Sequence, residues 1–271
     1  MQGKLIGEGR TAEVWEYGDH EVVKLYRDEI PEDQIRREFE ISQYVYNQGI
    51  GTPKPIEIVT IEGRMGIVFQ RIEGLSLLTY MGKQPWKIGG YATSMAELHH
   101  SLHKLEAAPG IGRQKEILRH NIIGAPILSV EEKSDIIAYL DKLPEGNKLC
   151  HGDFHPDNVL LDERMSVIDW MTGYAGEPAG DAARSVVMFS IGSMPPGTSF
   201  ITKLMIGIGR SRLTKRYVKE YLKRSGISYK EINQWVLPVA AARLTEWLPT
   251  SEKTHLAKEV RTRLRSKSFR L

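Results

Sequence analysis

The sequence contains very little cysteine and no long apolar run. Cys150 is the only cysteine among 271 residues, so no intramolecular disulfide can form and a zinc site built on cysteines is disfavoured. No apolar stretch approaches the length that spans a bilayer, and the first fifteen residues lack the apolar core of a secretory signal. We therefore expect a cytoplasmic protein in a reducing compartment, with no membrane partner.

The net charge is small, but its sign is unevenly distributed along the chain. Residues 171–271 contain 18 Lys and Arg against 7 Asp and Glu, whereas residues 1–170 contain 19 against 27. A basic second half favours an anionic partner, although a solvated basic surface explains the same balance. Because the chain has no motif typical of nucleic-acid binding, we expect no nucleic-acid partner.

The first seventy residues are typical of a small sheet with one helix. Strands are predicted at 4–9, 12–17 and 21–26, and a hairpin with its turn at Glu62-Gly63 is predicted over 56–72. Residues 31–49 begin with proline and acidic residues and end at Gly49, which are boundary signals of a helix.

From residue 73 onward the sequence is mostly helical. Helical periodicity covers 86–106, 131–142, 181–192, 212–225, 230–248 and 252–265. Two short apolar strands, NVLL and SVID, flank a turn at DER within 148–172. These patterns predict an α+β protein with a β-rich N-terminal domain, residues 1–72, and a mostly helical C-terminal domain, residues 73–271.

A glycine-containing turn separates the first two predicted strands. Residues 7–14, GEGRTAEV, nearly fit the pattern G-x-G-x-x-G-x-V, with Gly7 and Gly9 in place and Ala12 replacing the third glycine. Glycine lets a phosphate approach the backbone and its N–H groups. A plain hairpin turn is equally compatible with this motif alone.

A lysine inside the next apolar strand, EVVKLY, gives the glycine turn a context. The turn does not lead from a strand into a helix, so a dinucleotide-binding fold is disfavoured. A glycine-rich hairpin followed by a strand lysine, here Lys24, is the arrangement of protein kinases. A lysine in apolar surroundings needs an anionic partner. We expect Glu38 rather than Glu40, because Glu38 lies beside the buried stripe of the predicted helix; an outward-facing lysine is the alternative.

The stretch CHGDFHPDN, residues 150–158, concentrates polar groups around a glycine and a proline. In one interpretation Asp153 is a base and Asn158 a metal ligand, because D-x-x-x-x-N is the spacing of a kinase catalytic loop. Asp169 then follows at the end of an apolar strand, and its oxygen suits magnesium. In a second interpretation, His151, Asp153 and His155 hold a transition metal in a hydrolase. A polar turn without chemistry is the third interpretation.

These motifs resemble those of one family of small-molecule kinases. HGDFHPDN resembles the H-G-D-x-H-x-x-N loop of the aminoglycoside phosphotransferase and choline kinase family, and VIDW, residues 167–170, resembles its metal-binding stretch. The resemblance extends from GEGRTAEV to the helical tail. It implies a bilobal protein-kinase-like fold, ATP or GTP as phosphate donor, magnesium as cofactor and a small molecule with a hydroxyl group as substrate.

The resemblance also implies roles for individual residues. Asp153 would accept the substrate hydroxyl's proton or orient that hydroxyl, and Asn158 and Asp169 would hold magnesium. Lys24, held by Glu38, would reach the nucleotide phosphates, and Gly7 and Gly9 would also contact the nucleotide.

Further positions follow from the same resemblance. The backbone of Gln70 to Ile72 would bind the purine, with Phe69 behind it. His151 and His155 would shape the catalytic loop, and Asp181 would cap a helix and brace that loop.

Three histidines, His99, His100 and His103, cluster on one predicted helix. His99 and His103 are four residues apart on a predicted helix and suit a shared metal, but no third ligand is visible at suitable spacing, so packing near the catalytic loop is favoured.

The charge balance favours a neutral or anionic acceptor over a polycationic antibiotic, unless Glu177, Glu246 and Glu252 form an acidic pocket. A catalytically silent nucleotide-binding module remains an alternative.

Overall fold

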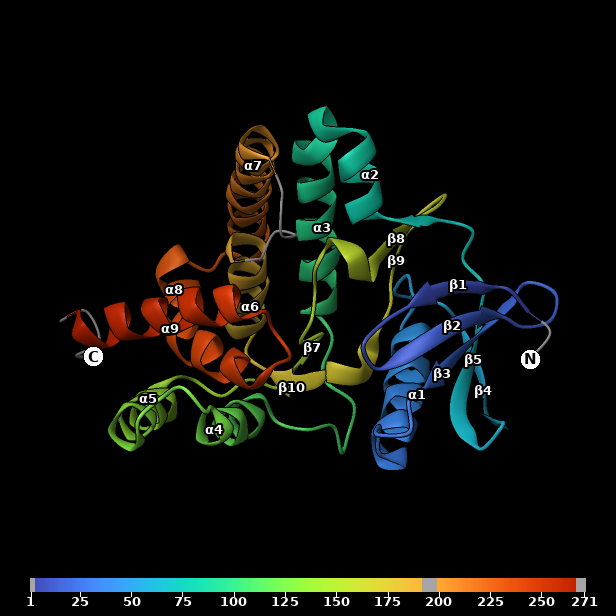
Figure 1. Cartoon of the computed structure of the whole chain (residues 1–271), viewed down its shortest axis with the longest axis horizontal. Helices are drawn as coiled ribbons and strands as arrows, with labels where there is room; N and C mark the ends of the chain where they lie inside the picture. The colour runs from blue at the N-terminus through green and yellow to red at the C-terminus, as the bar shows by residue number, and fades with distance from the viewer. Residues whose placement is uncertain (1–2, 192–198, 267–271) are drawn as a thin grey trace. The chain divides into compact units, whose positions relative to one another are not determined.

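The computed structural model describes residues 3–191 and 199–266, which form two compact units (Figure 1). Among these residues, the first unit comprises 3–80 together with 156–173, and the second comprises 81–155, 174–191 and 199–266. The segment 156–173 therefore packs with the N-terminal residues, although it lies far along the chain. The division into domains 1–72 and 73–271 with separate tasks stays a prediction.

The first unit is built on a five-stranded antiparallel sheet with the order β1-β2-β3-β5-β4. Its strands are β1 (Leu5–Glu8), β2 (Ala12–Glu16), β3 (Glu21–Tyr26), β4 (Pro55–Ile61) and β5 (Arg64–Gln70). The β4–β5 turn, Glu62-Gly63, has positive φ at both positions, 51° and 83°, which is the geometry of a tight two-residue hairpin. The predicted hairpin and sheet are thus present.

One helix, α1 (Glu32–Asn47), packs against this sheet. Acidic residues occupy its first turn, where they oppose the positive end of the helix dipole, and Gly49 follows its end with φ 75°. Ile35, Glu38, Ile41 and Val45 form its buried stripe, with the spacing of three and four residues that one helix face requires. The stripe includes a carboxylate, which the apolar core alone does not explain.

A small second sheet completes the first unit. It contains β6 (Leu75–Ser76), β8 (Val159–Leu161) and β9 (Met165–Val167), and β8 and β9 are the two strands predicted around DER. Two short 3-10 helices, η2 (Pro156–Asn158) and η3 (Trp170–Thr172), lie at the ends of this hairpin. The hydroxyl of Thr52 donates to the Val167 carbonyl at 2.8 Å and accepts from the Trp170 indole at 3.1 Å, which attaches the hairpin to the N-terminal residues.

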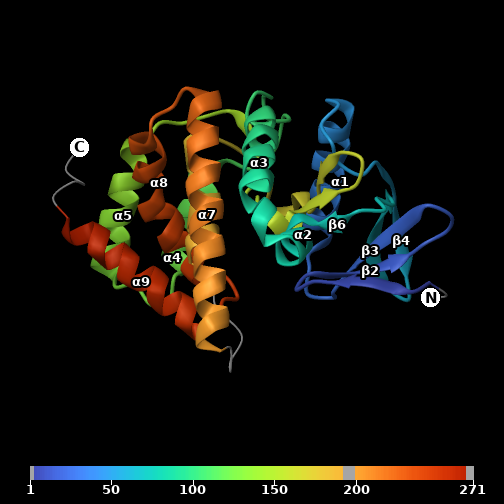
Figure 2. The same cartoon turned by 90° about the horizontal axis from the view of Figure 1, so that it is seen from above.

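The second unit is mostly helical, as predicted. Its helices are α3 (Ile88–Leu102), α4 (Gln114–Gly124), α5 (Val130–Lys142), α6 (Pro178–Ser190), α7 (Phe200–Ser225), α8 (Tyr229–Ala242) and α9 (Thr250–Arg265). α2 (Leu77–Lys83) and η1 (Pro85–Lys87) precede them, η4 (Arg243–Thr245) follows α8, and β7 (Lys148–Cys150) pairs with β10 (Tyr174–Gly176). Figure 2 shows α7 running beside α3, and the two helices are in contact.

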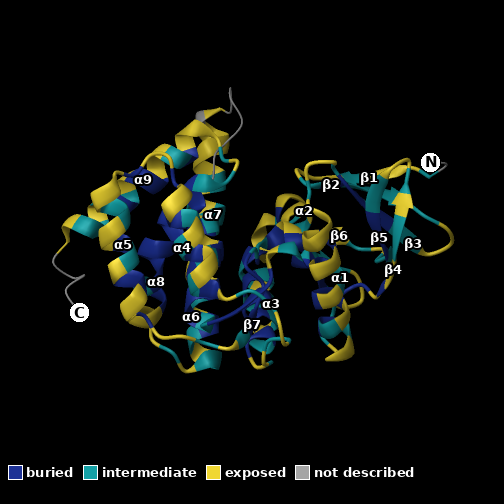
Figure 3. Ribbon diagram, turned by 90° about the horizontal axis from the view of Figure 1, so that it is seen from below, coloured by how far each residue is buried: buried dark blue, intermediate teal, exposed yellow. Residues whose placement is uncertain are grey.

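The core of the second unit lies around α8. This helix contacts α4, α5, α6 and α9, and Figure 3 shows it largely buried. No helix within residues 3–191 and 199–266 is both long and apolar enough to cross a membrane.

Three helices, α2, α4 and α7, depart from the sequence prediction. The short helix α2 lies in a stretch where no helix was predicted. α4 was not predicted, because its buried stripe contains only Gln114, Leu118 and Ile122. α7 begins twelve residues before its predicted start of 212, since Gly207 and Gly209 interrupt the pattern. Four apolar side chains of its first half are also exposed rather than turned inward: Ile201, Leu204, Met205 and Ile208.

Candidate active site

The first unit contains a buried lysine between two carboxylates. The Lys24 ammonium lies 2.6 Å from Glu38 Oε1 and 2.8 Å from Asp169 Oδ1. Its side chain is 12% exposed and that of Glu38 is 1% exposed, so the predicted pair of Lys24 with Glu38 is present and shielded from water. Glu40, the alternative partner, is exposed on the outer face of α1.

Tyr26 contacts both members of the Lys24–Glu38 pair. The Tyr26 hydroxyl donates to Glu38 Oε2 at 2.8 Å, and the Lys24 ammonium lies 5.3 Å from the centre of the Tyr26 ring. Burial disfavours the charged lysine, but the Asp169 and Glu38 carboxylates outweigh it and raise the pKa of Lys24. The ammonium is therefore a permanent positive charge. Tyr26 was missed by sequence reasoning, although it follows Lys24 by two residues on one strand face.

Asp169 has an unusual backbone conformation. Its φ of 67° and ψ of 68° lie in the left-handed region, which few residues other than glycine adopt. Such strain persists where the surroundings impose it and is frequent at functional sites. The Asp169 side chain is 38% exposed, so one of its faces meets Lys24 while the group stays accessible to a ligand.

Asn158 is brought close to Asp169 in the fold by the β8–β9 hairpin. The Ile168 N–H donates to the Asn158 carbonyl at 3.0 Å, and Val159 pairs with Val167. The two residues predicted to bind magnesium therefore lie at the same end of one hairpin. Their amide and carboxylate oxygens are ligands of the kind that magnesium prefers.

The glycine turn between β1 and β2 is a tight hairpin. The Gly9 N–H donates to the Ala12 carbonyl at 2.8 Å. A side chain added at Gly7 or Gly9 would meet its nearest neighbour at 3.6 or 3.5 Å, an ordinary contact, and neither residue has a positive φ. The fold itself therefore does not require glycine at these positions, which is consistent with a ligand that approaches the backbone.

The segment predicted to bind a purine follows β5. The Gln70 N–H donates to the Lys54 carbonyl at 2.9 Å and the Arg71 N–H to the His20 carbonyl at 2.8 Å. The N–H groups of Gln70 and Arg71 are thus engaged within the protein, and the purine-binding role of the backbone of Gln70 to Ile72 stays a prediction. Phe69 packs against the core cluster of Ala12, Tyr26, Ile35 and Ile67.

In the second unit, Asp153 lies between two basic side chains. Arg184 Nη2 lies 3.5 Å from Asp153 Oδ1, and His155 Nε2 lies 3.3 Å from Asp153 Oδ2. Burial opposes the charge of Asp153, but the hydrogen bond from His155 and the Arg184 guanidinium hold the pKa of its carboxyl well below the usual range. Asp153 is therefore an ionised, weakly basic carboxylate.

Arg184 belongs to an alternating series of charges that the sequence did not reveal. Its Nη1 lies 2.7 Å from Glu246, and Arg243 lies 3.0 Å from the other oxygen of Glu246 and 3.5 Å from Glu252. Arg184 also donates to the Gly152 carbonyl. Glu246 and Glu252 are thus paired with arginines, so they do not form a bare acidic pocket.

Asp181 holds the backbone of the loop that carries Asp153. Its carboxylate accepts the His151 N–H at 2.8 Å and the Gly152 N–H at 3.0 Å. Gly152 has φ 76°, a conformation that favours glycine. The predicted brace is present, whereas the predicted helix cap is wrong: α6 begins at Pro178 with Glu177 at its cap position.

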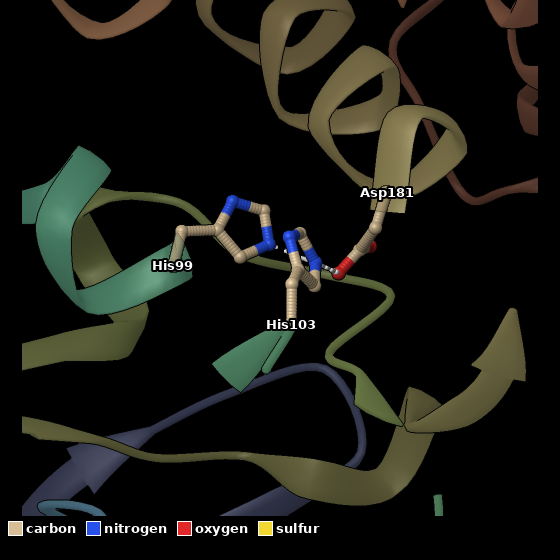
Figure 4. Close-up of side chains that lie close together, drawn as sticks. All are labelled: His99, His103 and Asp181. Atoms are coloured by element: carbon tan, nitrogen blue, oxygen red, sulfur yellow. Dashed lines mark hydrogen bonds and ion pairs between the residues drawn. The ribbon is translucent and has the colours of Figure 1, made fainter. Parts of the chain in front are cut away.

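The same carboxylate accepts from His99 of α3 and from His103, which directly follows α3, as Figure 4 shows. His99 Nε2 lies 3.0 Å and His103 Nε2 lies 3.2 Å from Asp181 Oδ2, and all three residues are buried. The third ligand that sequence reasoning did not find is therefore Asp181, 78 residues beyond His103. Among the described residues, this is the group whose spacing suits a metal ion. Its polar atoms are already linked by hydrogen bonds.

The alternative cluster of His151, Asp153 and His155 is not assembled as a metal site in the part of the chain that the structure describes. His151 is fully buried, and its Nδ1 accepts the Asp153 N–H at 3.1 Å, so this nitrogen shapes the loop. The geometry does not support the hydrolase interpretation.

Comparisons with known proteins agree with this architecture. A model of the phosphotransferase enzyme family matches residues 2–216. Acyl-CoA dehydrogenase family member 10 of Mus musculus is 23% identical over 185 residues, which is 60% of this chain but only 17% of the mouse protein. The chain thus spans less than a fifth of the length of this curated relative.

Solved structures share the fold across nearly all of both chains. An aminoglycoside-3'-phosphotransferase of type VIII is 17% identical, with a TM-score of 0.63 over 89% of this chain and 93% of that one. A streptomycin–ATP complex of an APH(2") enzyme is 15% identical, with a TM-score of 0.58 and coverages of 97% and 91%. A choline/ethanolamine kinase family protein from Mesorhizobium loti is also 15% identical, with a TM-score of 0.58 and coverages of 99% and 90%. These similarities confirm the predicted fold class.

Proposed function

Because the chain belongs to the phosphotransferase enzyme family, we propose that it transfers the γ-phosphate of ATP or GTP to a hydroxyl group of a small metabolite or antibiotic. The observation that carries this proposal is the buried contact of Lys24 with both Glu38 and Asp169. A lysine fixed in this way presents a permanent positive charge beside an accessible carboxylate. That combination suits a nucleotide phosphate with its metal ion.

The nucleotide is proposed to bind to the first unit. Lys24, oriented by Glu38, contacts the phosphates, and the backbone at Gly7 and Gly9 approaches them. The purine hydrogen-bonds to the backbone of Gln70 to Ile72. One structure of similar fold is described as a streptomycin–ATP ternary complex, which supports a nucleotide in this role.

Magnesium is proposed to be held by Asn158 and Asp169. An amide oxygen and a carboxylate leave coordination positions for phosphate oxygens and water, which is the pattern that this ion prefers. When bound, the ion neutralises phosphate charge. Asp169 also orients Lys24, because one of its oxygens lies 2.8 Å from the ammonium.

Asp153 is proposed to orient the acceptor hydroxyl and to receive its proton. The hydroxyl oxygen forms a bond to the γ-phosphorus while the bond from that phosphorus to the bridging oxygen breaks, and the nucleoside diphosphate leaves. The lowered pKa of Asp153 makes it a weak base. Its contribution is therefore mainly orientation, with proton transfer late in the reaction, when the new ester bond has made the proton acidic.

The acceptor is proposed to be neutral or anionic. The second half of the chain is strongly basic, and Glu246 and Glu252 are neutralised by Arg184 and Arg243. A polycationic acceptor would find few uncompensated carboxylates there.

A phosphotransfer screen tests the proposal. Purified protein is incubated with magnesium, ATP or GTP in parallel, and a panel of sugars, nucleosides, amino-acid derivatives and kanamycin-like compounds. Transfer to any hydroxyl compound that is lost in Asp153→Asn supports the kinase. Nucleotide binding without transfer to any compound or to water favours a silent nucleotide-binding module. Robust turnover of kanamycin overturns only the acceptor preference.

A further inference from the structure

Two tyrosines of α7 face two histidines with matched spacing. His99 lies in α3 and His103, four residues later, is the cap residue at its C-terminal end, while Tyr217 and Tyr221 are four residues apart on α7. The Tyr217 hydroxyl lies 2.6 Å from His99 Nδ1, and the Tyr221 hydroxyl lies 2.6 Å from His103 Nδ1. All four side chains are buried. The proposed kinase mechanism gives no role to either tyrosine.

Asp181 determines where the protons lie on the histidine nitrogens that contact it. Its pKa is well below the usual range, because hydrogen bonds from both histidines outweigh the cost of burial, so it is an ionised carboxylate that can only accept. His99 and His103 must therefore each carry a proton on Nε2. Burial lowers the pKa of His99 to about 3, so its ring is neutral and its Nδ1 is an acceptor. The Tyr217 hydroxyl is then the donor to Nδ1 of His99.

The His99 ring also contacts the catalytic loop directly. It stacks on Phe154, with ring centres 4.1 Å apart and planes inclined by 17°. Phe154 is fully buried and adjoins Asp153, and its carbonyl accepts from the Ser185 hydroxyl at 2.8 Å. Hydrogen bonds at both nitrogens fix the orientation of the His99 ring, and the Phe154 ring packs against it.

We propose that Tyr217 and Tyr221 are positioning residues for phosphate transfer, which act on Asp153 by fixing the proton positions and ring planes of His99 and His103. This inference rests on the proposed function. Tyr217 acts through Asp181 on the loop amides and through the stacked Phe154. It also hydrogen-bonds with the side chain of Ser185, which donates to the Phe154 carbonyl. Tyr221 acts through Asp181 alone, because the stacking contact with Phe154 belongs to His99.

The test compares Tyr217→Phe and Tyr221→Phe with Tyr139→Phe. Each change removes one oxygen and keeps the ring, including the edge contact between Tyr217 and Phe189. Tyr139 is a matched control, since its hydroxyl donates to the Gln234 carbonyl at 3.1 Å, away from the loop. We expect kcat to fall about tenfold in Tyr217→Phe and less in Tyr221→Phe, with the KM for nucleotide unchanged.

Two measurements separate positioning from a general loss of stability. In the wild-type protein, nitrogen-15 NMR should show His99 neutral, with its proton on Nε2. Hydrogen exchange at the His151 and Gly152 amides should accelerate about tenfold in Tyr217→Phe and stay unchanged in Tyr139→Phe.

Three results would overturn the proposal. These are a proton on Nδ1 of His99 in the wild type, equal kcat in Tyr217→Phe and Tyr139→Phe, or unchanged exchange of both amides. If the wild-type protein transfers no phosphate, the proposed function fails, and NMR and exchange still decide the positioning role. If Tyr217→Phe does not fold, Tyr221→Phe and the wild-type NMR spectrum provide the decision.

Discussion

The Lys24 ammonium lies 2.8 Å from Asp169, although 145 residues separate them in the sequence. This contact joins strand β3 to the end of the β8–β9 hairpin within one unit. It places the charge proposed to bind phosphates directly beside the carboxylate proposed to bind magnesium. Removal of either group should therefore disturb both nucleotide binding and local stability.

Replacement of the lysine should be costly for folding as well as for binding. Lys24→Met leaves the buried Glu38 carboxylate without its cation, and we expect the free energy of unfolding to fall by about 3 kcal/mol. Urea unfolding measures the loss. The double variant Lys24→Met with Glu38→Gln should recover part of it, because no buried charge remains. Equal stability of the wild type and Lys24→Met would show that the pair is not buried in solution.

Asp169→Asn should separate the charge of this residue from its backbone shape. Asparagine tolerates the left-handed conformation, so the strain at φ 67° is preserved while the carboxylate is lost. Magnesium should strengthen nucleotide binding by the wild type. In Asp169→Asn we expect this gain in affinity to be smaller by a factor of about ten or more. Calorimetric titration of ATP with and without magnesium measures this difference. An unchanged magnesium effect would remove Asp169 from the metal site.

The pH dependence of turnover should reflect the lowered pKa of Asp153. A carboxyl group with a depressed pKa is ionised above the ordinary value of about 4, and its charge is lost only as the pH falls through the lower folded value. The profile of kcat/KM should therefore show no acid limb from Asp153 between about pH 5 and 8.

Arg184→Gln should move the acid limb of the kcat/KM profile to higher pH. The guanidinium lies 3.5 Å from Asp153 and favours its charged form, so its loss raises the pKa of the carboxyl. The control is Arg119→Gln, which breaks a surface ion pair with Asp141 and should leave the pH profile unchanged. Identical profiles of the two variants would contradict the assigned role of Arg184.

Local patterns predicted much of the first unit. The period of α1 placed Glu38 on its buried stripe, and a lysine in an apolar strand demanded a carboxylate, so their pairing followed from two short segments. The hairpin at Glu62-Gly63 and the strands around DER followed from turn residues and short apolar runs. In each case the information lies within a few residues of the chain.

Contacts between distant segments could not be predicted in the same way. The partners Lys24 and Asp169, Asp153 and Arg184, and His103 and Asp181 are 145, 31 and 78 residues apart. No local period relates such positions, because the fold alone decides which strands and helices become neighbours. The buried tyrosines Tyr217 and Tyr221 resemble ordinary core residues in sequence, and only their hydroxyl contacts distinguish them.

The most direct test of the account compares γ-phosphate transfer by the wild-type protein and by Asp153→Asn under identical conditions. The wild type should transfer phosphate from ATP or GTP to a small hydroxyl compound in a magnesium-dependent reaction. Asp153→Asn should bind the nucleotide with nearly the same affinity and turn over about 10²–10⁴-fold more slowly. Equal transfer by the two proteins, or no magnesium-dependent nucleotide binding by either, would contradict the account.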